Sequence, residues 1–561
     1  MTIPEEKLKE LLLQIGLLDE KGYLELTKYA TNAHTTFEKA LVEKNIISEE
    51  NFAKMIANYV KIPFVSLSHV SIPQDLVHIV PERMARHFHV IPFERTPEGI
   101  KLAMTNPQDT LLQAQIAKKT GAKIIPYLAT DSEVRKALQI YKTDLQKTFD
   151  ELLQGKGGVI SPVLLNDAPV TKLVDMLVEY AYREQVSDIH IEPEEERSLV
   201  RFRIDGILHD VLLFPKNLHD RIITRIKVLS RLRTDEHLAS QDGKMRIQME
   251  EENLDIRVSI LPIVDGEKIV LRLLASQSRQ FSLTDLGMNE TDLQKVTKAY
   301  GKSYGMILST GPTGSGKSTS IYAILKILNI REKNITTIED PVEYRIKGVN
   351  QIQVNPKTNL TFASGLRSIL RQDPNIVMVG EIRDSEPAGI AVNAALTGHL
   401  VLSTLHTNDA ATALPRLIDM KVEPFLVAST INVIIAQRLV RKICDLCKTS
   451  VDTSFEEISK NLPPEMVKKH FGDKKQLHIY QGAGCKVCHG TGYNGRIGLF
   501  EVLEINSDLK KLINTKADSD TILKKAQEAG MAIMFDDGLD KVVKGITTIE
   551  EVLRVTKIES L

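Results

Sequence analysis

Residues 311–319 constrain this chain more than any other stretch, because their sequence, Gly-Pro-Thr-Gly-Ser-Gly-Lys-Ser-Thr, fits the pattern G-x-x-x-x-G-K-[ST]. A short apolar run, Met306 to Thr310, precedes the pattern and predicts a buried strand, and Ser320 to Leu328 follows it and predicts a helix. Glycines let backbone N–H groups turn inward around an anion, and the positive end of the helix points at the same place. A glycine-rich turn without a ligand is the alternative, and both flanks argue against it.

The loop predicts contacts to ATP and Mg²⁺. Lys317 would reach the β- and γ-phosphates, and Ser318 would supply a hydroxyl to the metal. The predicted nucleotide-binding residues are Gly311, Pro312, Thr313, Gly314, Ser315, Gly316, Lys317, Ser318 and Thr319.

Length and charge limit the classes of protein that remain. With 561 residues the chain is too long for one core, and about three or four domains are expected. A formal net charge of -1 provides no global attraction for nucleic acid or anionic lipid. The apolar stretch Val422 to Val440 is broken by polar residues, and the acidic N-terminus lacks an apolar signal core. We therefore expect a cytoplasmic protein that reaches a membrane only through partners and binds no nucleic acid.

The first 60 residues have helical patterns and a weak internal repeat at an offset of 29 residues, in which Leu12–Glu20 matches Leu41–Glu49. In each copy an apolar helix ends at Gly or Asn, and Asp19 or Ser48 begins the next helix. Two copies predict a small helical module, since a solenoid needs three or more repeats.

Residues 61–154 predict a compact α+β domain. Its expected strands are Ile62–Leu67, Val90–Glu94, Ile100–Met104 and Lys123–Leu128, and its expected helices are Pro73–Phe88, interrupted at Pro81, and Asp109–Thr120. A capping box at Thr130 then begins one helix that is expected to run to Leu152. The glycine-rich residues 155–165 predict a flexible linker, with a surface loop inside one domain as the alternative.

Residues 166–280 predict a second α+β domain. A helix is expected over Pro169–Glu184, a hairpin at Asp205-Gly206, and a basic helix over Arg221–Arg233. Arginines recur throughout this segment. Most are expected to be solvated or ion-paired, and anion contact is the alternative for a few.

Two groups of carboxylates follow predicted strands of the phosphate-loop domain, residues 281–561. Glu339, Asp340 and Glu343 follow the first strand, and Glu339 is the first choice for polarising the attacking water, with Glu343 the second. An N-cap cluster is the alternative. Glu381 follows the apolar run Ile376–Val379 and is predicted to hold Mg²⁺ or its water shell, a place where most phosphate-loop proteins use Asp.

Two histidines, His399 and His406, bracket another predicted core strand. Together with the neighbouring Ser, Thr and Asn they suggest γ-phosphate sensing, and a structural role is the alternative.

The four cysteines form two C-x-x-C pairs, Cys444 with Cys447 and Cys485 with Cys488, separated by 37 residues. Four thiolates in two pairs suit tetrahedral Zn²⁺, and the long gap predicts helices inside the insertion, residues 441–498. A redox pair, or His489 as a substitute ligand, is the alternative.

These residues together resemble the secretion ATPases of type II secretion and type IV pilus assembly, the GspE/PilB family, strongly over about 166–561. Gly311–Thr319 looks like the family's Walker A box, Thr337–Glu343 like its Asp box, Arg371–Asp384 like its Walker B box and Gly398–Asn408 like its His box. The tetracysteine is typical of the assembly ATPases and is missing from the retraction ATPases of the same superfamily.

The resemblance implies a RecA-like ATPase core with an inserted zinc subdomain, a PAS-like domain before it and a docking domain at 61–154. It also implies a ring of six subunits that moves around Leu274–Gly287, passes its motion to a membrane platform protein and the pilus base, and uses Arg203 and Arg225 to reach phosphate. Relatives bind cyclic di-GMP through Arg-Leu-Gly. The corresponding residues here are Lys7-Leu8-Lys9 and Thr36-Phe37-Glu38, so such binding is not expected.

The resemblance predicts a cytoplasmic ATPase motor for type IV pilus assembly at the inner membrane. A type II secretion ATPase is the second possibility, and a nucleotide-dependent scaffold with little turnover is the third. A phosphate-release assay separates the scaffold from the motors.

Overall fold

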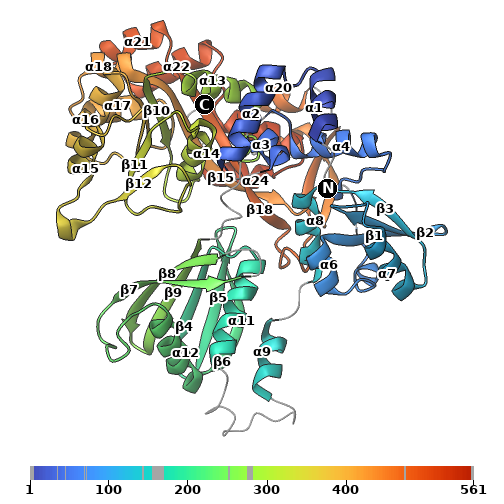
Figure 1. Ribbon diagram of the computed structural model, residues 1–561. Coiled ribbons are helices and arrows are strands. Elements are labelled where there is room, and N and C mark those ends of the chain that lie inside the picture. The colour runs from blue at the N-terminus through green and yellow to red at the C-terminus, as the bar shows by residue number, and fades with distance from the viewer. Residues whose placement is uncertain are drawn as a thin grey trace. The chain divides into compact units, whose positions relative to one another are not determined.

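The computed structural model describes residues 5–33, 36–43, 46–67, 70, 72–141, 145–154, 170–249, 253–274, 282–460, 462–472 and 476–556. The chain divides into two compact units, one of Met1–Lys61 with Gln280–Leu561 and one of Ile62–Arg279 (Figure 1). In the described part of the chain, no helix combines the length and the hydrophobicity that crossing a bilayer requires.

The N-terminal segment is helical, as predicted. Its helices are α1 (Glu5–Gln14), α2 (Glu20–Ala33), α3 (Phe37–Glu43) and α4 (Glu49–Val60). After α1 the chain turns at Gly16, whose φ of 69° lies in the left-handed region, and the Ser48 side chain caps α4 by accepting from the Asn51 N–H. Asn45, the counterpart of Gly16 in the second repeat, lies outside the described residues.

A three-stranded sheet in the order β1-β2-β3 organises residues 62–141. Its elements are α5 (Gln74–Val77), α6 (Glu82–Phe88), β1 (Val90–Thr96), β2 (Gly99–Met104), α7 (Thr110–Thr120), β3 (Ile124–Leu128), α8 (Asp131–Ala137) and the 3-10 turn η2 (Leu138–Tyr141). The strand predicted over Ile62–Leu67 is wrong, because the structure has only a single bridge there, Phe64 to Leu128. Pro63 has no N–H to donate, and its carbonyl alone accepts, from Leu128.

The single helix predicted from Thr130 to Leu152 is also wrong. It consists of α8, η2 and a separate helix α9 (Leu145–Gln154). The Tyr141 hydroxyl donates to the carbonyls of Val77 and Val80, which holds η2 in the core of residues 65–141. Phe149 on α9 instead packs in the core of the next domain. The apolar repeat is therefore divided between two cores. The predicted linker 155–165 lies outside the described residues.

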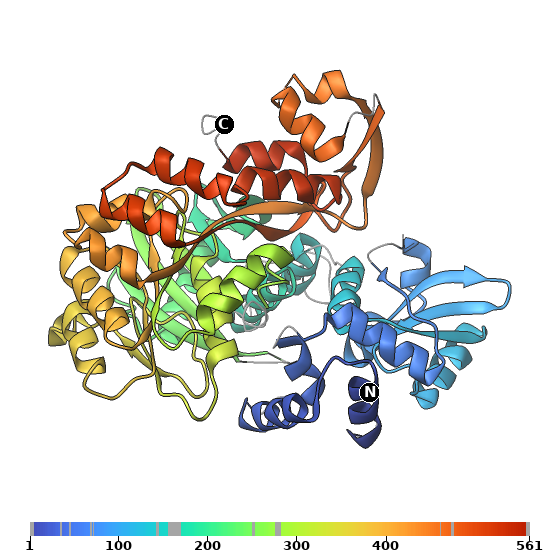
Figure 2. The ribbon, with the colours of Figure 1, turned by 90° about the horizontal axis from the view of Figure 1, so that it is seen from above.

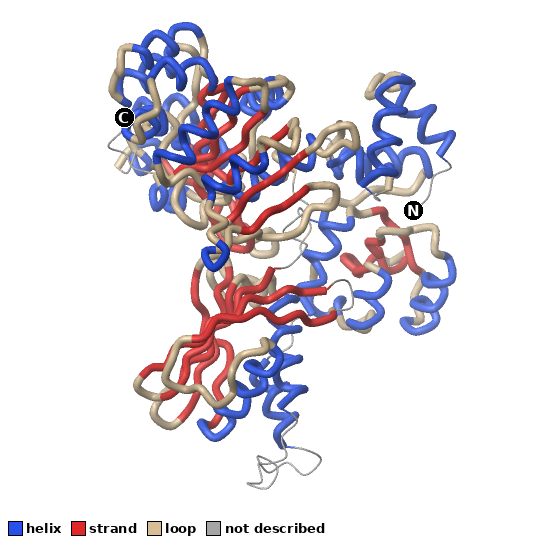
Figure 3. The backbone as a smooth tube through the Cα atoms, turned by 60° about the vertical axis from the view of Figure 1, so that its left-hand side comes forward, coloured by secondary structure: helices blue, strands red, loops and turns tan. Residues whose placement is uncertain are grey.

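The next domain is a six-stranded antiparallel sheet in the order β6-β5-β4-β9-β8-β7. Its elements are α11 (Val170–Arg183), β4 (Asp188–Pro193), β5 (Arg197–Ile204), β6 (Ile207–Pro215), α12 (Lys216–Leu229), β7 (Gln241–Gln248), β8 (Asn253–Ile263) and β9 (Gly266–Leu274). Both helices cover the same face of the sheet (Figure 3). The predicted hairpin at Asp205-Gly206 is present, and both of its residues have positive φ.

The basic helix predicted over Arg221–Arg233 begins and ends earlier than expected. It starts after Pro215, whose extended backbone provides the N-cap, and it ends at Leu229. Arg231 adopts a φ of 57° just beyond the helix, and its N–H donates to the Val228 carbonyl. Arg231 and Arg233 therefore lie outside the helix.

The phosphate-loop domain is built on a seven-stranded sheet in the order β12-β11-β13-β14-β10-β15-β18, parallel except for the edge strand β18. Its first elements are α13 (Glu290–Tyr300), β10 (Gly305–Thr310), α14 (Lys317–Leu328), β11 (Ile335–Glu339), β12 (Asn350–Gln353), α15 (Phe362–Ile369), β13 (Ile376–Val379), α16 (Ser385–Leu396), β14 (Leu400–Leu405), α17 (Ala413–Asp419) and α18 (Pro424–Thr430). Helices α13 and α14 pack on one face, and α15 to α18 pack on the other (Figure 1). Both faces are buried, which explains the continuous apolar runs of the central strands. Because these strands are parallel, the residues that follow β10, β11, β13 and β14 all lie at the carboxyl-terminal ends of the strands, which is called one edge of the sheet below.

The longest strands of the sheet are β15 (Ile431–Ile443) and β18 (Tyr493–Glu504), which pair antiparallel. Between them come β16 (Lys448–Ser454), α19 (Phe455–Ile458), α20 (Pro464–Phe471) and β17 (Gln476–Gly482). After β18 come α21 (Ser507–Asn514), α22 (Ser519–Glu528), α23 (Met534–Val543) and α24 (Ile549–Val555), of which the last two pack beside β15 and β18 (Figure 2). The insertion contains the predicted helices. Its bounds are narrower than the predicted 441–498, because β15 ends at Ile443 and β18 begins at Tyr493, so only residues 444–492 lie outside the main sheet.

Candidate functional site

The phosphate loop joins the fully buried strand β10 to helix α14, as the pattern predicts. Gly311, Gly314 and Gly316 all have φ in the left-handed region. A side chain at Gly311 would have its Cβ 2.5 Å from the Gln437 carbonyl oxygen, and one at Gly316 would have it 2.7 Å from Gln437 Nε2. The loop therefore requires glycine both for its backbone path and for its contact with β15.

The Lys317 side chain lies back over the loop. Its Nζ donates to the carbonyls of Gly311 at 2.7 Å and Pro312 at 2.9 Å, and the residue is buried. Burial lowers the pKa of Lys317, the Glu381 carboxylate acts in the opposite direction, and the positive charge of Arg438 lowers the pKa further. An incompletely neutralised ammonium at the start of a helix suits an anion, and the exposed Ser318 beside it leaves a hydroxyl available for Mg²⁺. The residues present thus fit a magnesium–nucleotide complex.

Glu381 and His406 meet at the same edge of the sheet. They follow the adjacent strands β13 and β14, and β14 lies next to β10. His406 Nε2 is 3.1 Å from a Glu381 carboxylate oxygen, and the Arg383 guanidinium pairs with the other oxygen. His399, by contrast, lies at the opposite end of β14 with its Nδ1 3.0 Å from the Ala394 carbonyl oxygen, which is a structural position. Of the two histidines only His406 is near the loop.

Glu339 ends β11, and its buried carboxylate is part of a hydrogen-bond network. The hydroxyls of Tyr322 and Thr337 donate to its carboxylate, and Gln351 Nε2 donates to it at 3.2 Å. The side chain is 3% exposed and linked through Tyr322 to α14, the helix that follows the loop. These donors hold the Glu339 carboxylate in place, and its role as the group that activates water stays a prediction. Glu343, the second choice, is half-buried.

Arg203 and Arg225 belong to the domain of the six-stranded sheet. Arg203 Nε lies 3.6 Å from an Asp188 carboxylate oxygen, and Arg203 Nη1 donates to the Gly206 carbonyl. Arg225 Nε is buried without a hydrogen-bond partner. Their contact with phosphate stays a prediction. The proposed hinge Leu274–Gly287 lies partly outside the described residues.

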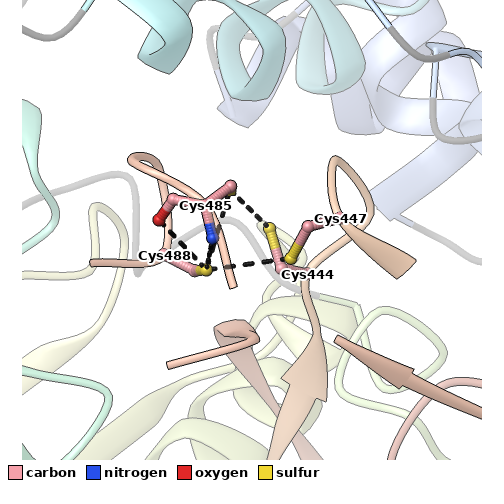
Figure 4. A group of neighbouring side chains, drawn as sticks. All are labelled: Cys444, Cys447, Cys485 and Cys488. Carbon is pink, nitrogen blue, oxygen red and sulfur yellow. Dashed lines mark hydrogen bonds between the residues drawn. The ribbon is translucent and has the colours of Figure 1, made fainter. Parts of the chain in front are cut away.

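The four cysteines come together at the base of the insertion (Figure 4). Their sulfur atoms all lie within 4.8 Å of one another, with separations of 3.8 Å for Cys444–Cys485 and Cys447–Cys488 and 3.7 Å for Cys485–Cys488. A zinc tetrahedron with Zn–S bonds of about 2.3 Å has sulfur atoms about 3.8 Å apart, so the set fits Zn²⁺.

The thiols need such a cation to ionise together. Burial raises the pKa of Cys444 and raises that of Cys447 to about 11. Burial also acts to raise the pKa of Cys488, and N–H donation by Cys485 and Gly492 outweighs it and lowers the pKa. Metal binding supplies the positive charge that four thiolates require.

Three residues near the loop were missed by sequence reasoning: Tyr322, Gln437 and Glu501. Gln437 is fully buried, accepts from Ser320 Oγ at 2.7 Å and leaves its Nε2 without a partner beside the loop. Its position as a polar residue within the apolar stretch Val422–Val440 was the available signal. Nothing in the sequence marked Tyr322 or Glu501.

Glu501 on β18 holds the segment that follows His406. The carboxylate accepts from the Ala410 N–H at 2.9 Å and the Met534 N–H at 3.4 Å. Burial raises its pKa from 4.5 to about 7, backbone donation opposes this, and the charge of Asp409 adds to the rise. Because the folded pKa lies above the unfolded one, this group's contribution to stability is complete below pH 4.5 and is lost as the pH rises through 7.

Glu501→Gln is therefore expected to raise the melting temperature at pH 8 and to have little effect at pH 5. At pH 8 the ionised Glu501 carboxylate lowers the free energy of unfolding by about 3 kcal/mol, and the neutral amide removes this cost. The amide has only one acceptor oxygen, however, so its N–H₂ group faces the Met534 N–H, and the net gain in stability is about 1–2 kcal/mol. Thermal unfolding of both proteins at the two pH values checks this. A variant that melts lower than the parent at pH 8 would contradict the assignment.

Residues 164–554 match the family described as "Type II/IV secretion system protein", and residues 60–146 match the MshEN domain. The "Type IV pilus assembly ATPase PilB" of Myxococcus xanthus is 36% identical over 98% of both chains. The "Type II secretion system protein E" of Pseudomonas aeruginosa is 45% identical over 70% of this chain and 77% of that protein.

Among solved structures, the Legionella pneumophila ATPase DotB matches with a TM-score of 0.51 at 20% identity, covering 72% of this chain and 98% of that one. This likeness supports the predicted α/β ATPase fold. The family match spans most of the chain, and the relative in M. xanthus is similar along nearly its whole length. The chain therefore belongs to the type II/IV secretion system protein family.

Proposed function

We propose that this chain hydrolyses ATP and drives type IV pilus assembly at the inner membrane. The observation that carries the proposal is the meeting of Lys317, Glu381 and His406 at one sheet edge, in a chain similar over 98% of its length to a protein named as a type IV pilus assembly ATPase. The motor acts as a ring of six subunits in the cytoplasm and transmits its motion to a membrane platform protein and the pilus base.

The residues divide the chemistry between them. Lys317 leaves the loop carbonyls and neutralises charge on the β- and γ-phosphates, while the loop N–H groups orient them. Bound Mg²⁺, held by Ser318, would supply further positive charge at the same oxygens. Glu381 holds the metal's water shell, and His406, hydrogen-bonded to Glu381, reports whether the terminal phosphate is present.

The water-activating carboxylate is Glu339 in this proposal, with Glu343 as the alternative. Glu339 has three side-chain donors, so in this network its pair of oxygens is held in a fixed orientation. Glu343 is more exposed and lies four residues beyond Glu339, the last residue of β11. Arg203 and Arg225 contribute positive charge to the phosphates of a neighbouring subunit.

Lys317→Ala is expected to abolish ATP turnover, lowering the phosphate-release rate by about 100-fold or more, because transition-state charge on the γ-phosphate loses its nearest cation. Lys298→Ala is the matched control, since Lys298 is exposed and pairs with Glu504 on the surface. Steady-state phosphate release by purified full-length protein, with the melting temperature as a check on folding, measures the effect. Normal turnover by Lys317→Ala would show that the site is misassigned, and no turnover by the parent protein would favour the scaffold.

A type II secretion motor is the second candidate, because proteins named for that system match at 45% identity over 399 residues and at 36% over 99% of this chain. Deletion of the gene in its own host separates the two candidates. Loss of surface pili supports the first, and loss of exoprotein secretion with pili intact supports the second.

Regulation by cyclic di-GMP stays an open prediction. The MshEN match covers residues 60–146, whereas Lys7-Leu8-Lys9 and Thr36-Phe37-Glu38 precede it. We propose that these positions, which differ from Arg-Leu-Gly, leave the chain without affinity for cyclic di-GMP.

A further inference from the structure

The strand β15 lies directly against the phosphate loop. It pairs parallel with β10, with Thr310 opposite Ala436 at the last register position. Beyond that pair, the Gln437 carbonyl approaches Gly311, and Gln437 Nε2 approaches Gly316. The next residue of β15, Arg438, therefore also lies beside the loop, although about 120 residues separate the two segments in the sequence.

Arg438 is poorly neutralised for a partly buried cation. Its Nη2 donates to Asn408 Oδ1 at 3.0 Å, and its Nε is buried without a hydrogen-bond partner. Within the described residues its guanidinium forms no ion pair with a carboxylate; Asp409 contributes only at longer range. Other arginines of this domain are paired directly, such as Arg441 with Glu551 at 2.7 Å.

The surroundings of Arg438 also favour an anion. Burial lowers the pKa of Arg438, and its charge helps to lower the pKa of Lys317. Two neighbouring cations with reduced solvation repel each other, and an anion placed between them relieves both penalties. On the opposite face of β15, Gln437 Nε2 is buried beside Gly316 of the loop and has no hydrogen-bond partner among the described residues.

We propose that Arg438 is a positioning residue that contacts the phosphates of the nucleotide bound by its own subunit. Its Nη2 stays on Asn408, which follows His406 in the chain, while its remaining N–H groups donate to phosphate oxygens. Arg438 would then connect the segment of His406 and Asn408 to strand β15, which leads to Cys444. This inference rests on the proposed ATP site and adds a residue to it.

Arg438→Gln in the full-length protein is expected to weaken binding of Mg-ADP and of a non-hydrolysable Mg-ATP analogue by about tenfold or more, because charge-assisted contacts to phosphate are lost. Its melting temperature without nucleotide is expected to equal or exceed that of the parent, because the variant removes a partly buried cation that lacks an ion pair. Arg438→Lys keeps the positive charge but lacks the forked guanidinium, so its nucleotide affinities are expected to lie between those of the parent and those of Arg438→Gln.

Arg441→Gln is the matched control on the same strand. Arg441 pairs with Glu551 and stacks on Tyr493 at 4.1 Å. This variant is expected to lower the melting temperature and to leave both nucleotide affinities unchanged. Calorimetric titration and thermal unfolding, with and without nucleotide, give both readouts.

Two results would overturn the inference: nucleotide affinities of Arg438→Gln equal to those of the parent, or a fall in its nucleotide-free melting temperature like that of Arg441→Gln, which would make Arg438 a structural link to Asn408. Absence of binding by the parent protein itself would instead overturn the proposed function. The two failures are therefore distinguishable.

Discussion

Cys485→Ser is expected to release the metal of the insertion, lowering zinc from about one ion per chain to a small fraction of that. Three thiolates and a serine hydroxyl bind Zn²⁺ far less tightly, and structural zinc contributes about 10–16 kcal/mol of apparent binding free energy in small zinc domains. The loss is expected to be large because a bound metal would join the two ends of the insertion, with Cys444 directly after β15 and Cys488 shortly before β18. Elemental analysis of the purified protein measures the metal.

The same variant is expected to open residues 444–492 locally. The two-stranded sheet of β16 and β17 is too small to be stable alone, so limited proteolysis is expected to cleave within this segment first. His489→Ala is the control, because His489 is next to Cys488 and lies outside the group of sulfur atoms. Full zinc content in His489→Ala supports four cysteine ligands. Parent protein that carries no zinc and forms disulfides in non-reducing electrophoresis would favour the redox alternative.

Glu381→Gln is expected to lower ATP turnover by about 100-fold or more while leaving nucleotide affinity nearly unchanged. The amide has the shape of the carboxylate and lacks its charge. It therefore fills the same space beside His406 and Arg383 but lacks the negative charge that would attract the metal's water shell and that pairs with the Arg383 guanidinium.

Single-turnover and steady-state phosphate release, together with nucleotide titration, check this separation between chemistry and binding. Glu290→Gln is the control, because Glu290 is exposed in the first turn of α13, a helix that packs on β15 and β18. Turnover by Glu381→Gln within a few-fold of the parent, or equal losses in Glu290→Gln, would show that Glu381 is not part of the reaction site.

The phosphate loop and the cysteine pairs could be predicted because a few consecutive residues determine each of them. Residues 311–319 adopt the predicted loop because their glycines allow backbone angles that few other residues tolerate, and because the flanking apolar runs form a strand and a helix. The cysteine pairs were likewise readable, since two C-x-x-C spacings each bring two sulfurs to one turn. Such features depend on a few consecutive residues, and a pattern can identify them.

Other parts of the site depend on packing between distant segments. Glu339 is hydrogen-bonded to Gln351 on the adjacent strand β12 and to Tyr322 on α14. No sequence motif or residue spacing identifies either partner. The helix predicted from Thr130 to Leu152 divides because Tyr141 and Phe149 belong to different cores. Local propensity contains no information about which core a side chain will enter.

The sequence alone determined that this chain has a glycine loop of the phosphate-binding pattern, carries a tetracysteine and belongs with the secretion ATPases, because each of these is encoded within short contiguous stretches. Only the tertiary structure decided that His406 rather than His399 meets Glu381, and that Arg438 lies beside the loop with no carboxylate partner among the residues that the structure describes. Strand order and register determine these contacts, and they arise from burying both faces of a seven-stranded sheet at once.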